Sequence, residues 1–153
     1  MTASLIDTNI LVYANNADSP FHSKCKALVE KAVSGSLQTA ISVQNLIELY
    51  AVITDKRRVE RPLPPVKAKE LIEFYQHNEK IQVIIPKSET LSTILKLIAK
   101  HKPKAQSIFD YLLVATMTDN NIYEIYTANT DHFKPFTSIR AINPILDLNL
   151  SNK

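Results

Sequence analysis

Glycine and cysteine are almost absent from this chain of 153 residues, which contains one of each. The single glycine, Gly35, excludes the glycine-rich loops that bind phosphates in P-loop and dinucleotide-binding proteins, because those loops need several glycines at fixed spacing. The single cysteine, Cys25, excludes an intramolecular disulfide and any zinc site built from several cysteines. A protein of this composition that handles phosphate groups must use metal ions or basic side chains.

Long apolar runs are also missing. No stretch approaches the roughly 18 apolar residues of a membrane span, and the N-terminus lacks the basic, apolar and small-residue pattern of a signal peptide. We therefore expect a cytoplasmic protein. The formal net charge is +3 and the pI is about 8.9, a mildly basic balance that is compatible with a polyanionic partner but is weak evidence for one.

Short apolar segments alternate with longer amphipathic ones along the chain. The predicted strands lie directly before Asp7 and at Leu37–Ile41, Ile81–Ile85, Ile122–Ala128 and Ser138–Ile142. The predicted helices lie at Phe21–Val33, after Ser42, after Pro65, after Ser88 and at Ala105–Thr118. This alternation predicts an α/β fold with a mostly parallel, twisted sheet of four to five strands flanked by helices. It fits one domain (1–148) with a frayed tail (149–153).

Two serines are predicted to cap helices, namely Ser42 and Ser88. Apolar residues three or four positions apart define the predicted inner face of each helix. For the helix after Ser42 they are Val43, Leu46, Ile47, Tyr50, Ala51 and Thr54. For the helix after Ser88 they are Leu91, Ile94, Leu95 and Ile98.

Asp7 follows the first predicted strand and precedes two small polar residues, Thr8 and Asn9. In open α/β sheets the carboxyl ends of the strands are where ligands bind. An ionised aspartate there is costly to bury unless it meets a cation or several hydrogen-bond donors. The alternative is an aspartate that accepts hydrogen bonds from the turn that it begins.

Two further acids lie on predicted helices. Asp110 interrupts an otherwise apolar helix, and carboxylates are rarely buried without a partner. Its structural alternatives are a salt bridge to Lys104 or a favourable place in the first helical turn. Glu48 lies beside the apolar stripe of its helix, where a solvated glutamate is the alternative.

A polar and acidic cluster, Tyr126–Phe133, follows the fourth predicted strand and repeats the pattern seen at Asp7. It includes His132, which we interpret as a surface-loop residue. Carboxylates that converge without cysteines suit Mg²⁺ or Mn²⁺, which take oxygen ligands. Such a site can activate water and stabilise in-line displacement at a phosphodiester.

Four stretches resemble, in order, the motifs of one family. IDTNILVYA contains Asp7, SVQNLIELYAVITDKRRVERPLP contains Glu48, SIFDYLLVATMTDNNI contains Asp110, and YTANTDHF follows, with AINPI near the end. The chain resembles the PIN-domain family and, within it, the VapC-type toxins of bacterial type II toxin–antitoxin pairs. The resemblance covers nearly the whole chain and is therefore more specific than DTN alone.

The resemblance implies a PIN-like three-layer fold and a divalent-metal-dependent endoribonuclease. It places catalytic carboxylates at Asp7, Glu48 and Asp110, with Mg²⁺ or Mn²⁺ on Asp7 and Asp110. Thr8 and Asn9 take supporting positions. The resemblance also implies a homodimer and inhibition by a small cognate antitoxin.

The fourth motif departs from the family pattern. The family often has aspartate two residues after the threonine, where this chain has Asn129. Asn129 could ligate through its carbonyl oxygen or hold a metal-bound water, and Asp131 could substitute for it. Both assignments stay open.

Basic side chains are candidates for RNA contact, because phosphate contacts dominate nucleic-acid affinity. The candidates are Lys56, Arg57, Arg58, Lys102 and Lys104. A solvated basic surface is the alternative interpretation.

Two other functions fit parts of the pattern. One is a catalytically degenerate PIN-like module that only binds RNA or protein, which metal-dependent cleavage would exclude. The other is a phosphohydrolase with Asp7 as nucleophile. Those enzymes usually place a second aspartate two residues after the first, and this chain has Asn9 there.

Overall fold

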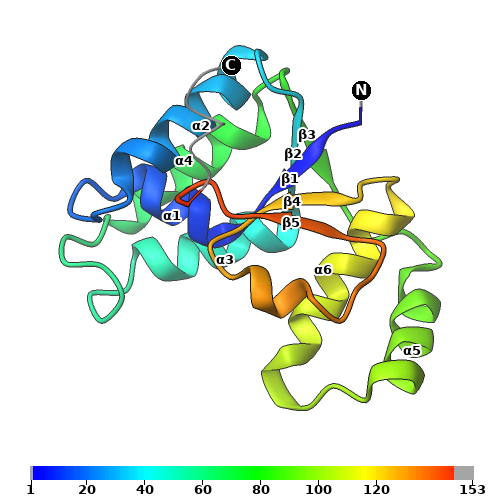
Figure 1. Ribbon diagram of the computed structural model, residues 1–153. Coiled ribbons are helices and arrows are strands. Elements are labelled where there is room, and N and C mark those ends of the chain that lie inside the picture. The colour runs from blue at the N-terminus through cyan, green and yellow to red at the C-terminus, as the bar shows by residue number, and fades with distance from the viewer. Residues whose placement is uncertain (1, 147–153) are drawn as a thin grey trace.

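The computed structural model describes residues 2–146, which form a five-stranded parallel sheet with helices on both faces (Figure 1). The strands are β1 (Ser4–Ile6), β2 (Thr39–Ser42), β3 (Ile81–Ile84), β4 (Glu124–Tyr126) and β5 (Arg140–Ile142). The helices are α1 (Thr8–Asn15), α2 (His22–Ser34), α3 (Val43–Ile53), α4 (Pro65–Gln76), α5 (Thr90–His101) and α6 (Ile108–Asp119), with 3₁₀ turns η1 (Ala105–Ser107) and η2 (Thr130–Phe133). The predicted α/β fold is confirmed. The predicted tail (149–153) lies outside the described residues.

The strand order, β3-β2-β1-β4-β5, places β1 at the centre of the sheet. Leu5 in β1 lies opposite Ala40 of β2 on one side and Ile125 of β4 on the other. Strands β2 and β3 follow β1 on one side of it, and β4 and β5 lie on its other side. The carboxyl end of β1 is therefore a point where the strand order reverses, and open α/β sheets bind ligands at such points.

The two faces of the sheet belong to two separate cores. Ile6 and Ile41 pack in the cluster that includes α1 to α4, whereas Leu5 and Ala40 pack in the cluster that includes α6. Successive strand residues point to opposite faces, so each strand supplies both cores. Figure 1 shows the resulting layers, with α1, α2 and α4 on one side and α6 on the other. No helix within residues 2–146 is long and apolar enough to cross a membrane.

Helix α3 begins at the predicted cap. The Ser42 hydroxyl accepts a hydrogen bond from the Asn45 backbone N–H (3.0 Å), and Asn45 Oδ1 accepts one from the Ser42 backbone N–H (3.2 Å). The predicted inner face is wrong in part, because Val43, Ile47 and Tyr50 are 38%, 63% and 37% exposed. The buried side consists of Asn45, Leu46, Leu49 and Ile53. Helix α3 has two apolar stripes, and the spacing of apolar residues in the sequence does not determine which stripe packs against the core.

Helix α5 departs further from its prediction. It begins at Thr90, two residues after the predicted cap Ser88, and the Thr90 hydroxyl accepts a hydrogen bond from the Lys87 backbone N–H (2.8 Å). Leu91 and Leu95, predicted to face inward, are 65% and 57% exposed. The helix lies at the edge of the molecule beside α6 (Figure 1), so only part of its apolar surface is covered.

Candidate functional site

Asp7 joins the end of β1 to the start of α1. Its backbone N–H donates to the Tyr126 carbonyl (3.0 Å), and its Oδ1 accepts from the Thr8 backbone N–H (2.8 Å). The side chain therefore caps α1, which is the local role that the sequence left open. The second oxygen, Oδ2, accepts hydrogen bonds from the Thr127 hydroxyl (2.7 Å) and the Asn9 amide (3.1 Å).

Asn9 and Thr127 connect α1 to the loop after β4. The Asn9 amide nitrogen donates to the Thr127 hydroxyl (3.2 Å), and Asn9 Oδ1 accepts from the Ala128 backbone N–H (3.0 Å). These bonds hold Asp7 in its orientation, and the supporting role of Asn9 stays a prediction. Sequence reasoning does not identify Thr127, although a hydroxyl directly after a strand that neighbours β1 is a usable signal.

Glu48 extends into the same region from α3. Its Oε2 accepts a hydrogen bond from the Thr8 hydroxyl (2.9 Å), and its Oε1 accepts one from the Gln44 amide (2.8 Å). The same Gln44 nitrogen donates to the Phe109 carbonyl (3.1 Å) and so ties α3 to α6. Glu48 is half-buried and hydrogen-bonded, in contrast to the solvated glutamate that was its alternative.

Asn45 contacts both Thr8 and Asp7 from the buried side of α3. It is fully buried, and its amide nitrogen donates to the Thr8 hydroxyl (3.1 Å) and makes a longer contact of 3.5 Å with Asp7 Oδ1. Its oxygen completes the cap of α3 with Ser42. Asn45 thus connects the helix that carries Glu48 to the strand end that carries Asp7.

Asp110 lies in the first turn of α6, as one sequence alternative predicted. Its Oδ2 is 3.3 Å from Nδ1 of His132 in η2, and the two side chains are 32% and 57% exposed. Within residues 2–146 Asp110 forms no ion pair with Lys104, so that alternative is wrong. His132 is exposed as predicted, but no sequence pattern indicated that it contacts an acid of the site.

Both aspartates of the site have raised pKa values. Burial raises the pKa of Asp7, and the charges of Glu48 and Asp110 raise it further against the hydrogen bonds that it accepts. Burial also raises the pKa of Asp110, where Glu48 adds to the shift and His132 opposes it. Among residues 2–146, no lysine or arginine pairs with any of the three. The site therefore carries negative charge that no cationic lysine or arginine in this range neutralises.

The carboxylates of Asp7, Glu48 and Asp110 offer only oxygen atoms as ligands, and oxygen is the ligand that hard divalent cations such as Mg²⁺ prefer. In the described part of the chain, no three carboxylate, imidazole or thiolate groups already lie at the mutual distances that one ion requires. Glu48 is directed toward Thr8 and Gln44, and Asp110 toward His132. The site suits an ion held by one or two carboxylates and completed by water, as Mg²⁺ commonly is.

The two candidates for the fourth position differ in their surroundings. The backbone N–H of Asn129 donates to the Thr127 hydroxyl (3.0 Å), the same hydroxyl that contacts Asp7. Asp131 is exposed and paired with Lys134, which lowers the pKa of its carboxyl. Asn129 is therefore the better connected of the two, and the role of either remains a prediction.

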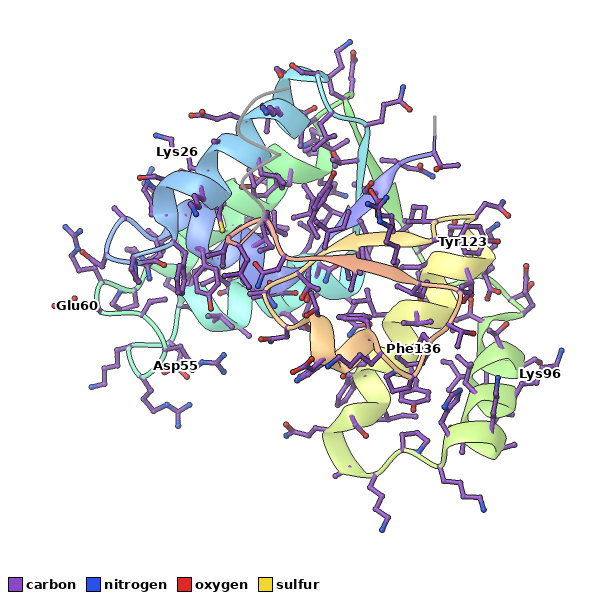
Figure 2. All side chains as sticks on the ribbon, viewed as in Figure 1. Lys26, Asp55, Glu60, Lys96, Tyr123 and Phe136 are labelled. Carbon is purple, nitrogen blue, oxygen red and sulfur yellow. The ribbon has the colours of Figure 1, made fainter. Side chains whose placement is uncertain are left out.

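The basic candidates occupy two separate segments. Figure 1 places the loop with residues 56–58 after α3 and the loop with residues 102–104 between α5 and the start of α6. Arg57 is bound to Asp55, and this hydrogen bonding lowers the pKa of Asp55 to about 2. The loop that carries Asp55 projects outward (Figure 2). The remaining candidates form no ion pair within residues 2–146; they are Lys56, Arg58, Lys102 and Lys104.

Comparison with known proteins identifies the family of this chain. The family model for the PIN domain matches residues 4–136, a span that includes Asp7, Glu48 and Asp110. Ribonuclease VapC24 of Mycobacterium tuberculosis is 31% identical over 141 residues, which make up 92% of this chain and 95% of that protein. Ribonuclease VapC48 of the same species is 28% identical over 138 residues, or 90% and 94% of the two chains. The chain therefore belongs to the PIN-domain family, and within that family to its VapC-type members.

Solved structures share the fold. The sarcin–ricin-loop-cleaving toxin VapC20 of Mycobacterium tuberculosis aligns with a TM-score of 0.65 and 18% identity, over 90% of this chain and 99% of that one. VapBC2 of Rickettsia felis, bound to a DNA fragment from its promoter, aligns with a TM-score of 0.64 and 18% identity, over 93% and 98%. The predicted PIN-like three-layer fold is thereby confirmed.

Proposed function

We propose that this protein is a divalent-metal-dependent endoribonuclease and the toxin of a type II toxin–antitoxin pair. The observation that carries the proposal is the gathering of Asp7, Glu48 and Asp110 near the carboxyl end of the central strand, where the charge of Glu48 raises the pKa of both aspartates. The names of the two VapC relatives, both ribonucleases, support the same reaction class.

Asp7 and Asp110 would hold Mg²⁺ or Mn²⁺, with Glu48 binding directly or through water. When bound, the ion supplies an activated water and neutralises charge on the scissile phosphate. Thr8, Asn9 and Thr127 hold the carboxylate of Asp7 in place, and Thr8 also holds that of Glu48. No histidine base is required in this scheme.

Protein partners form part of the proposal. The family membership supports a small cognate antitoxin and a homodimer, and the structural relatives include a VapBC pair. Exposed apolar side chains on α4 and α5 leave surface for such contacts: Val66, Phe74, Leu91 and Leu95.

A toxin that cuts cellular RNA would act in the cytoplasm. The adjacent reading frame tests this role, because the absence of a small antitoxin there would count against it.

A cleavage assay on single-stranded RNA tests the proposed reaction. Cleavage should require Mg²⁺ or Mn²⁺ and stop with EDTA. Glu48→Gln and Asp110→Asn should each slow it by about a hundredfold or more, because each removes a negative charge that would hold or lie near the cation. Asp18→Asn is the matched control, since Asp18 lies outside the site and is paired with Arg61.

The cleavage assay also distinguishes the proposed ribonuclease from its main alternative, a module that only binds RNA or protein. RNA binding without metal-dependent cleavage would replace the proposed enzyme with a catalytically degenerate binding module. Cleavage that survives EDTA, or that Asp18→Asn reduces as much as Asp110→Asn does, would contradict the assigned roles.

A further inference from the structure

The loop that follows β4 contacts both of the aspartates proposed to hold the cation. At its start, the Thr127 hydroxyl donates a hydrogen bond to Oδ2 of Asp7 (2.7 Å). Further along the loop, in η2, Nδ1 of His132 lies 3.3 Å from Oδ2 of Asp110. The first contact belongs to the network that holds Asp7, and the second relates to Asp110 in the same way.

Asp110 has no other side-chain partner in the described part of the chain. No lysine or arginine within residues 2–146 pairs with it, and its second oxygen, Oδ1, accepts no hydrogen bond from these residues. One oxygen of the carboxylate therefore faces an imidazole, and the other is available for a ligand. Carboxylates that bind metals are commonly oriented by a further hydrogen bond of this kind.

Buried neighbours hold His132 in place. Its backbone N–H donates to the Asn129 carbonyl (3.1 Å), and the next residue, Phe133, is buried in the core that also includes Tyr111. The ring centroid of Phe136 lies 4.7 Å from that of Tyr111 and 6.4 Å from that of Phe133. Aromatic packing thus joins η2 to the first turn of α6, and the contact between the imidazole and the carboxylate follows from it.

We propose that His132 is a positioning residue of the metal site, which holds Asp110 through an N–H at Nδ1 and leaves Oδ1 free for the cation. The inference rests on the proposed function, because it takes Asp110 to be a metal ligand. The imidazole carries this N–H in one neutral tautomer and in its charged form, so the role does not depend on the charge of the ring. Loss of the donor should weaken metal binding without removing any ligand.

Binding of Mn²⁺, measured by electron paramagnetic resonance of the free ion, tests this role. His132→Ala should weaken binding by about tenfold or more, as expected for the loss of a group that orients a ligand. His132→Asn should keep most of the affinity, because the asparagine amide nitrogen occupies nearly the position of Nδ1. His132→Gln places its amide nitrogen nearer the position of Nε2 and should behave like His132→Ala.

Nuclear magnetic resonance of the metal-free protein measures the contact itself. In EDTA, the ring nitrogen signals of His132 should show a proton on Nδ1, and they should change in Asp110→Asn. The matched control is His77→Ala, which removes another exposed imidazole. His77 follows α4 and precedes β3, so it lies near the amino edge of the parallel sheet, away from the carboxylates. This variant should leave Mn²⁺ binding and the His132 signals unchanged.

The dependence of RNA cleavage on Mn²⁺ concentration distinguishes a positioning residue from a ligand. His132→Ala should recover most of the parent's rate when Mn²⁺ is saturating, because every ligand is still present. Asp110→Asn should stay slow at any Mn²⁺ concentration, because a ligand itself is lost.

The results separate this role from the proposed function. Equal Mn²⁺ affinity of the parent and His132→Ala, with weak binding by Asp110→Asn, would refute the positioning role and leave the ribonuclease intact. Binding by His132→Asn as weak as that by His132→Ala would also refute it, since the donor at Nδ1 would not be the group that matters. Binding of Mn²⁺ that depends on His132, in a protein that cuts no RNA, would support the positioning role and refute the ribonuclease.

Discussion

Asp7 has two roles that impose opposite demands on its surroundings. As the cap of α1 it accepts a hydrogen bond from the Thr8 backbone, which favours the charged form. As a member of an acidic group it is buried near Glu48 and Asp110, which disfavours that form. A cation would satisfy both demands, and the stability of the protein should therefore respond to metal.

Added Mn²⁺ or Mg²⁺ should raise the melting temperature. A ligand that binds only the folded state stabilises it by mass action, by about 2.7 kcal/mol at 100 times its dissociation constant. Asp110→Asn should reduce the rise measured by calorimetry, whereas Asp18→Asn should keep it, because Asp18 pairs with Arg61 outside the site. Identical melting curves with and without metal would count against a cation at this site.

The metal-free protein should become more stable as the pH falls from neutral. Asp7 and Asp110 have native pKa values above the ordinary 3.8, so the folded state binds their protons more tightly than the unfolded state does. Their contribution to the free energy of unfolding is fully present below 3.8 and is lost as the pH rises through the raised native pKa. Asp18 and Asp55, with lowered pKa values, act in the opposite direction and below 3.8.

Urea denaturation in EDTA at a series of pH values measures this effect. The Asp7→Asn variant should show a flatter dependence above about pH 4, because one of the two raised groups is gone. A variant with the same slope as the parent would show that Asp7 is not the group responsible.

The residues of the site were predictable to different degrees. Asp7 and Asp110 stand out locally, since each is an acid in an apolar stretch. Thr127 and Asn45 do not, because their roles depend on partners 120 and 37 residues away in the chain. His132 was unrecognised for the same reason, as only the fold brings η2 to the first turn of α6.

At the scale of the element, two serines with the same sequence signature differ in the structure. Ser42 is buried and exchanges hydrogen bonds with Asn45, whereas Ser88 is exposed and lies before the start of α5. Ser42→Ala should lower the free energy of unfolding by about 1 kcal/mol or more. Ser88→Ala should change it by less than about 0.5 kcal/mol. Chemical denaturation measures both, and equal effects would contradict the assigned caps.

The exposed stripes of α3 and α5 show where periodicity is insufficient. Ile47 and Leu95 follow a helical spacing as regular as that of Leu49, yet only Leu49 meets the core. Spacing determines which residues share a face, but the position of the helix against the sheet decides which face is buried. That position depends on the strand order, which no local pattern contains.

At the scale of the whole molecule, the alternation of strands and helices was enough to predict a parallel α/β sheet. It was not enough to place β1 between β2 and β4, since that order follows from the way in which the crossovers pack. The central position of β1 nevertheless brings Asp7 beside Thr127, which follows β4, and Thr8 beside Glu48 of α3, which follows β2.

The basic side chains on the surface should contribute to the affinity for RNA to different degrees. Lys104→Ala should weaken binding and lower the slope of affinity against salt by about 1, as expected for the loss of one phosphate contact. Arg57→Ala should have less effect, because its guanidinium is already bound to Asp55. Binding of single-stranded RNA to Asp7→Asn protein, with salt varied, measures both. A larger loss for Arg57→Ala would contradict this assignment.

The most direct test of the central claim compares Asp7→Asn with the parent in two assays on the same single-stranded RNA in Mg²⁺. We predict that the cleavage rate falls by about a hundredfold or more, because the carboxylate at the end of β1 no longer holds the cation. RNA affinity should stay the same or increase, since removing a negative charge does not weaken attraction to phosphate. A variant that cuts RNA as fast as the parent would contradict the account.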